Sequence, residues 1–124
     1  MRGYVAAMAK PYSDALVAPG PLLFLSGQFP VSSDGEVPGD VAGQTRQVFT
    51  NMERLLAGHG ADLGDLVKIT YYLRHITDLD EFRSALSDCL PRGHRPAGTL
   101  VEVSGLVDPR YLVQVEGIAS LGER

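Results

Sequence analysis

The sequence predicts a single α+β domain over residues 1–124, in which short strands alternate with two helices. A length of 124 residues fits one hydrophobic core and leaves no room for two. Short apolar runs bounded by Gly and Pro are typical of strands, and two longer segments carry apolar side chains at helical spacing. Because such helices cannot bury their apolar stripes alone, we expect both to pack on a sheet.

The first strand is predicted at Leu22–Ser26, and weaker strand candidates are residues 3–8 and 16–18. A helix is expected to begin after Asp40, whose side chain can accept from free backbone N–H groups. We expect it to end at Gly60, where left-handed backbone is favourable. Its predicted apolar stripe is Val41, Val48, Met52, Leu55 and Leu56, beside a polar face of Gln44, Arg46, Gln47, Asn51 and Glu53.

A second strand is predicted over residues 67–73, and a second helix follows it. The helix is expected to open at Thr77 or Asp78, because Asp78 and Glu81 have the spacing of a capping box. Pro91 should end it. The strand should place Ile69, Tyr71 and Leu73 opposite Lys68, Thr70 and Tyr72, and the helix stripe is Leu79, Phe82, Leu86 and Leu90.

Two further strands are predicted at Thr99–Ser104 and Tyr111–Ile118, with a turn between them. The face expected to pack on the helices consists of Thr99, Val101, Val103, Tyr111, Val113 and Val115. The opposite face would carry the carboxylates of Glu102 and Glu116 and the amide of Gln114. Such a face is either solvated or a surface for a partner subunit or a ligand, and the residues alone name no reaction.

Composition and spacing argue against several classes of protein. The formal net charge of −4 disfavours nucleic-acid binding, which needs a dense basic surface, and one Cys excludes an internal disulfide framework. No apolar run could span a membrane and no secretion signal is present at the start, so we expect a cytoplasmic protein. No His pair has metal-ligand spacing, so we expect no metal, and no Gly-rich phosphate loop precedes a helix.

Short motifs from about Pro11 to Ala119 follow one another in an order that resembles the Rid (YjgF, RidA) family. Each motif alone is weak, but their order and spacing together are specific. They are Pro11–Ser13, Leu25–Pro30, Gly35–Val37, Asp40–Val41, Gln44–Gln47, Asp65–Thr70, Asp78–Leu79 with Phe82, Arg95–Ala97, Val101–Val103 and Val115–Ala119.

The resemblance implies a chorismate-mutase-like, or YjgF-like, fold in which two helices pack on one face of the sheet. It also implies a homotrimer whose sheets line a central barrel, with clefts for a small-molecule metabolite between adjacent subunits. The best-known members hydrolyse reactive 2-imino or enamine acids to 2-oxo acids and ammonia, without metal or cofactor. The polar sheet face would then form the barrel interior and the cleft wall.

Compared residue by residue with the family, this chain differs at several positions of the cleft that the resemblance implies. Members with that activity have an Arg directly after the Pro-Ala pair, which binds the substrate carboxylate, and this chain has Gly98 there. Gln114 replaces a Glu that positions the attacking water, Leu100 replaces a Cys, and Leu86 replaces an Asn. The family residues kept are Tyr12, Ser26, Gly27 and Glu116, and Thr99 adjoins Gly98 in the same cleft wall.

The missing guanidinium changes the expected ligand. Removing a bidentate Arg from a bound carboxylate costs about 2–5 kcal/mol. Arg95 and Arg110 are the arginines considered as replacements. Without them the cleft is wider, more apolar and less cationic, which suits a larger or less charged metabolite.

Three functions remain open at this point. In the first, an enzyme hydrolyses, dehydrates or tautomerises an imine, an enamine or a related carbonyl compound. Glu116 transfers the proton, Tyr12 donates a hydrogen bond, Gln114 orients water or a carbonyl, and backbone N–H groups near Ser26 and Gly27 polarise an oxygen. In the second, the trimer binds a small molecule or acts as a chaperone without turnover, and Glu116 is a structural carboxylate. The third, a ribonuclease, is disfavoured by the negative charge.

Overall fold

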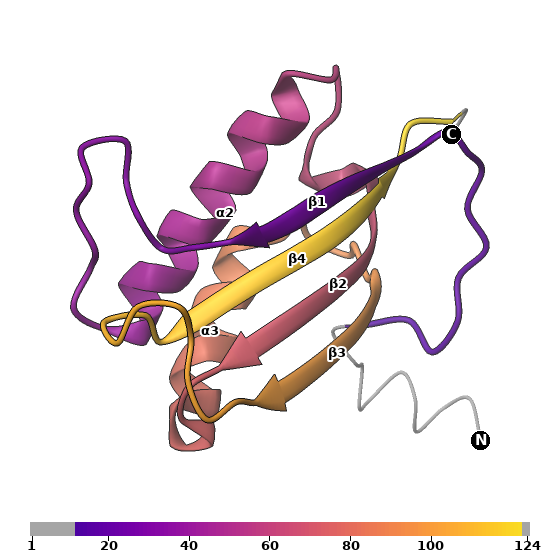
Figure 1. Cartoon of the computed structure of the whole chain (residues 1–124). Helices are drawn as coiled ribbons and strands as arrows, with labels where there is room; N and C mark the ends of the chain where they lie inside the picture. Colours follow the sequence, from indigo (N-terminus) through magenta and orange to yellow (C-terminus); the bar gives the residue numbers. More distant parts are fainter. Residues whose placement is uncertain (1–11, 123–124) are drawn as a thin grey trace, which may run out of the picture.

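The computed structural model describes residues 12–122, which form one four-stranded sheet with two α-helices on one face (Figure 1). The weak strand candidate at 3–8 lies outside the described residues. The strands are β1 (Leu22–Gln28), β2 (Leu66–Leu73), β3 (Ala97–Glu102) and β4 (Val113–Ser120); the helices are α2 (Val41–Ala57) and α3 (Leu79–Cys89). The expected α+β class is therefore confirmed.

The sheet has the order β1-β4-β2-β3. Strand β4 lies between β1 and β2 and runs antiparallel to both, whereas β3 runs parallel to β2 at the edge. A parallel neighbour needs a crossover connection, and α3 supplies it between β2 and β3. The covered side of the sheet is called the helix face below, and the other side is called the open face.

Helix α2 begins as the sequence predicts, because Asp40 Oδ1 accepts from the Gly43 N–H at 2.9 Å. It ends at Ala57, three residues before Gly60, whose φ of +71° is the expected left-handed backbone. Its stripe is buried apart from Leu55, which is 40% exposed. The central core side chains, all with 0% exposure, include Val48, Met52, Leu56, Leu66, Ile69, Leu73, Phe82, Val113 and Val115.

Gln44 is buried with 1% exposure, so its predicted place on the polar face of the helix is wrong. Its Nε2 donates to the carbonyls of Pro38 and Arg110 at 2.8 and 2.9 Å, and its Oε1 accepts from the Leu112 N–H at 2.7 Å. The amide therefore satisfies three backbone groups of two loops, and this is why a polar side chain can be buried there.

Helix α3 follows a 3-10 turn at Ile76–Asp78. Asp78 is its N-cap residue, as predicted, but makes no side-chain cap hydrogen bond, so the expected capping box is wrong. The carboxylate of Glu102 instead accepts from the Ile76 N–H at 2.8 Å. The start of this helix is thus held by a strand and not by its own first turn.

Residues 16–18 form no strand, and Val17 is 99% exposed. Strand β3 begins two residues before the predicted Thr99, and β4 begins two residues after the predicted Tyr111. The segment before β1 meets β3 through an isolated parallel bridge between Ser13 and Ala97.

The predicted faces of β3 are reversed. The parallel register pairs Thr70 with Thr99 and Tyr71 with Leu100, so Thr99 and Val101 lie on the open face. Gly98 and Leu100 lie on the helix face beside the buried Tyr71. Alternation within β3 shows which residues share a face, but only its pairing with β2 shows which face that is.

Strand β1 contains a bulge at Ser26 and Gly27. Leu25 pairs with Gly117 and Gln28 pairs with Val115, so β1 advances three residues where β4 advances two. A bulge leaves one residue unpaired in the ladder and bends the strand. The Ser26 carbonyl at this position accepts from Gln28 Nε2 at 3.1 Å.

Among residues 12–122, no helix is both long and apolar enough to cross a bilayer.

Substitution of Gly117 by Ala should destabilise the fold by about 1–3 kcal/mol, because the added carbon would lie 3.0 Å from Leu66 Cδ2 and 3.4 Å from the Lys68 carbonyl. Gly98→Ala is the matched control, since its added carbon meets no atom closer than 3.7 Å. Urea unfolding of both variants measures the difference. Equal midpoints for Gly117→Ala and the wild type would contradict the packing described here.

Candidate functional site

The sheet divides the predicted site residues between its two faces. Gly98 and Leu100 point toward the helices with Tyr71, whereas Glu116 pairs with Thr70 on the open face. Two hollows result, one on each side. The hollow on the helix face is called the β3 pocket, and the one on the open face is called the open-face groove.

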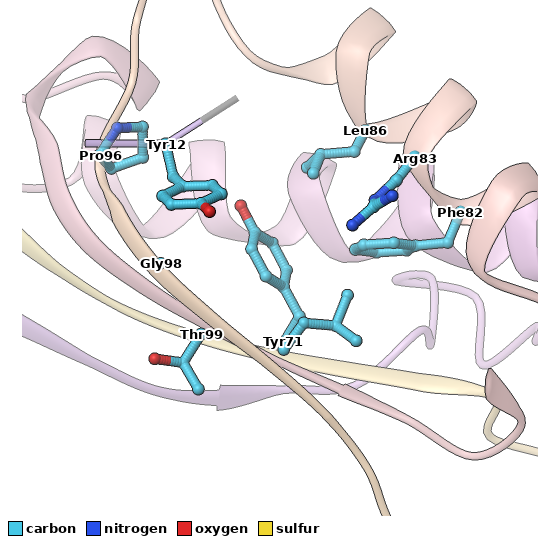
Figure 2. Close-up of a pocket in the computed structure, with 9 residues that line it drawn as sticks. Tyr12, Tyr71, Phe82, Arg83, Leu86, Pro96, Gly98 and Thr99 are labelled. Carbon is cyan, nitrogen blue, oxygen red and sulfur yellow. The ribbon is translucent and has the colours of Figure 1, made fainter. Parts of the chain in front are cut away.

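The β3 pocket is a cavity of about 220 Å³ between β3, α3 and the segment at Tyr12 (Figure 2). Its lining residues are Tyr12, Tyr71, Phe82, Arg83, Leu86, Pro96, Gly98, Thr99 and Leu100. Tyr12, Leu86, Gly98 and Leu100 are thus brought together, as the sequence predicts. Thr99 lines the cavity from the strand, but its hydroxyl lies 3.4 Å from Lys68 Nζ on the open face.

Tyr12 is held over Gly98 by the residue that follows it. The Ser13 N–H donates to the Pro96 carbonyl at 3.1 Å, and the Ser13 hydroxyl donates to the Arg95 carbonyl. A carbon added at Gly98 would lie 3.7 Å from Tyr12 Cβ. The wall formed by Tyr12 therefore depends on backbone bonds to the residues that lead into β3.

Tyr71 and Phe82 form the inner wall, with ring centroids 5.3 Å apart in an edge-to-face arrangement. Burial, and to a smaller degree the nearby Cys89, raises the pKa of Tyr71. Its phenol is therefore neutral under ordinary conditions. In Figure 2 the hydroxyl end of Tyr71 points toward Tyr12.

Neither arginine considered from the sequence lines the β3 pocket. Arg95 lines a neighbouring hollow, and Arg110 forms an ion pair with Asp108 at 2.9 Å. A third arginine, Arg83 of α3, does line it. Sequence reasoning missed Arg83, although its position three residues before Leu86 places both side chains on one helix face.

The open-face groove encloses about 240 Å³ and is lined by Phe24, Leu25, Ser26, Lys68, Thr70, Glu116, Gly117 and Ile118. Lys68 Nζ donates to Thr70 Oγ1 at 3.1 Å and to the Ile69 carbonyl at 3.3 Å. The groove thus contains an ammonium and a carboxylate. Lys68 was predicted to share this face with Thr70 and Tyr72, but its role beside Glu116 depends on the register and was missed.

Glu116 lies beside Tyr72. Desolvation, followed by the charge and hydrogen bonding of Glu116, raises the pKa of the Tyr72 phenol. Tyr72 therefore remains a hydrogen-bond donor to the carboxylate.

Gln114 and Gly27 are in close contact at the edge of the groove. A carbon added at Gly27 would lie 2.3 Å from Gln114 Nε2. Gly27 is thus required for the amide to lie over the bulge of β1. Of the predicted open-face residues, Ser26 and Glu116 line the groove, whereas Gly27 follows Ser26 along the chain and Gln114 lies two residues before Glu116.

Within the described range, no cluster of three His, Cys, Asp or Glu side chains could hold a metal ion.

Comparison with known proteins relates nearly the whole chain to one family. The sequence profile of the endoribonuclease L-PSP family matches residues 4–121. A RutC family protein of Pyrococcus horikoshii is 38% identical over 111 residues, covering 88% of this chain and 86% of that protein. The 2-iminobutanoate/2-iminopropanoate deaminase of Escherichia coli is 33% identical over 104 residues, covering 81% of this chain and 80% of the enzyme.

Solved structures share the fold. A YjgF family member of Neisseria meningitidis superposes with a TM-score of 0.74 at 29% identity, covering 83% of this chain and 82% of that one. A member of the YjgF/YER057c/UK114 family of Mycobacterium tuberculosis gives a TM-score of 0.72 at 30% identity, with 95% and 92% covered. The expected YjgF-like fold is therefore confirmed.

Substitution of Glu116 by Gln should lower the pKa of Tyr72 toward its ordinary value, because the neighbouring negative charge is removed. An NMR titration of ¹³C-labelled tyrosine, with the signal assigned by Tyr72→Phe, measures the change. Glu102→Gln is the matched control, since Glu102 bonds Ile76 on the helix side. An unchanged Tyr72 titration in Glu116→Gln would refute the contact.

Proposed function

This chain belongs to the endoribonuclease L-PSP family, which includes the YjgF and Rid proteins, and we propose that it hydrolyses a reactive imine or enamine in clefts between the subunits of a homotrimer. The reaction uses neither metal nor organic cofactor. One observation carries the proposal. The site residues lie on opposite faces of one sheet, so a complete cleft needs the β3 pocket of one subunit and the open-face groove of another.

The apolar side chains on the open face support the assembly. Phe24 is 67% exposed and Val101 is 40% exposed, and both flank the polar groups of the groove. Apolar groups of this size on a sheet face are typical of an interface. A second copy packed there would bury them and would bring Glu116 to a neighbour's β3 pocket.

Glu116 is the group proposed to move protons. Its carboxylate accepts a proton from water as the oxygen adds to the imine carbon, and then returns the proton to nitrogen. The carboxylate next takes the hydroxyl proton of the carbinolamine so formed and passes it to the same nitrogen, so that the C–N bond breaks, ammonia leaves, and the carbon becomes a carbonyl. Tyr72 donates to this carboxylate, and Lys68 lines the same groove.

Three groups are proposed to orient the reacting atoms. Gln114 lies over Gly27 and positions the water or the forming carbonyl. Backbone N–H groups at the β1 bulge, near Ser26, polarise the oxygen. Tyr12 of the neighbouring β3 pocket donates a hydrogen bond and covers the substrate.

The β3 pocket favours a substrate body larger than the ethyl group of 2-iminobutanoate. Gly98 leaves its part of the wall unfilled, and Leu86 and Leu100 add apolar contact. The cleft was expected to be less cationic, and Arg83 is an arginine that lines this pocket. The proposed substrate is therefore larger than 2-iminobutanoate.

The protein should be a trimer in solution. Light scattering at micromolar concentration should give three times the chain mass of 13.3 kDa. Phe24→Asp should lower this mass by placing a charge in the apolar interface, whereas Val17→Asp, at a 99% exposed position, should not. A wild-type monomer would contradict the inter-subunit cleft.

The protein should accelerate ammonia release from an imine generated freshly from leucine by an amino-acid oxidase, and less so from the alanine-derived imine. Glu116→Gln should reduce the rate constant by about 10²–10⁴-fold, the usual contribution of a positioned acid-base group. Glu102→Gln should retain the rate, because that side chain holds α3 on the other face.

Two outcomes would separate the alternatives. Saturable binding of the corresponding 2-oxo acid without any acceleration of ammonia release would refute the enzyme and support the non-catalytic binding trimer. Acceleration that survives Glu116→Gln would remove Glu116 from the proposed mechanism.

A further inference from the structure

The β3 pocket has a cation at its rim that comes from a helix. Arg83 of α3 lines the cavity, and Figure 2 shows its side chain between Leu86 and Phe82, with the guanidinium directed toward Tyr71. Over residues 12–122, no carboxylate forms an ion pair with Arg83. The guanidinium therefore has its five N–H donors available to a ligand.

Tyr71 supplies a second donor on the inner wall. Because burial raises the pKa of Tyr71, its phenol keeps its proton and can donate. This residue lines the same cavity as Arg83. A donor in a largely apolar setting gains more from an acceptor than the same donor in water.

The other walls favour an apolar ligand body. Phe82, Leu86, Pro96 and Leu100 surround the space, and no Asp or Glu is among the described residues that line it. An ammonium group in this pocket would meet a like charge and no carboxylate. An anionic oxygen would meet the guanidinium and the phenol.

We propose that Arg83 and Tyr71 form an anion-binding subsite, so that the β3 pocket takes a small carboxylic acid with an apolar body. The guanidinium binds one or both carboxylate oxygens, the phenol donates to the same group, and the aliphatic or aromatic body fills the space at Gly98. This names the substrate class of the cleft proposed above and rests on that function. Arg83 is a specificity-determining residue, distinct from the proton-transfer residue Glu116.

Binding of a stable probe tests the subsite without requiring turnover. The probe is 4-methyl-2-oxopentanoate, compared with its neutral amide of the same shape, and NMR titration of the full chain gives both dissociation constants. Arg83→Gln should raise the constant of the acid by about 10- to 100-fold, the range of a charge-assisted hydrogen bond, and should leave that of the amide unchanged. Tyr71→Phe should raise the dissociation constant of the acid by a smaller factor.

Arg92→Gln is the matched control. It removes the same charge from the same side of the molecule, but Arg92 lines only the neighbouring hollow, so the affinity for the acid should be retained. Arg83→Lys should recover part of the affinity, because the charge returns without the planar fork.

The inference is overturned if wild-type protein binds the acid no better than the amide, or binds neither. It is also overturned if Arg83→Gln and Arg92→Gln raise the dissociation constant of the acid equally. These results are separable from the fate of the proposed function. Acid binding that depends on Arg83 without imine hydrolysis supports the subsite and refutes the enzyme. Hydrolysis of the leucine-derived imine at a rate that Arg83→Gln leaves unchanged supports the enzyme and refutes the subsite.

Discussion

The parallel pairing of β3 with β2 is the constraint on which the site depends. It aligns Thr70 with Thr99 and Tyr71 with Leu100, and so determines which side chains of β3 face the helices. A slip of one residue would turn Gly98 and Leu100 to the open face, removing two walls of the β3 pocket. The crossover through α3 fixes this register and also delivers Leu86 and Arg83 to the same cavity.

The sheet separates two kinds of chemistry. Its helix face offers an apolar cavity with donors from Arg83 and Tyr71, whereas its open face offers Glu116 with Lys68 and Tyr72. A single subunit cannot apply both sets to one small molecule, because the sheet lies between them. In the proposed cleft, ligand recognition and proton transfer therefore fall to different surfaces of the same chain.

Local signals in the sequence were enough to predict where helices and strands occur, but not which side chains of each element are buried. The Asp40 cap and the apolar run of β1 act through near neighbours, so both could be predicted. The burial of Gln44 depends on loops up to 68 residues away, and the position of Arg83 depends on how α3 returns to β3. The family resemblance correctly predicted the fold, but neither Arg95, three residues before Gly98, nor Arg110, in the turn between the last two strands, lines the β3 pocket.

The surroundings of Gly98 allow it to be replaced. A Cβ added there would lie 3.7 Å or more from its neighbours, which is ordinary van der Waals contact, so replacement by Ala carries little strain. Positions that tolerate change while bordering a ligand allow specificity to diverge without loss of the fold. Descendants of one ancestral chain could therefore acquire new preferences at this residue by single substitutions, without compensating changes in the core.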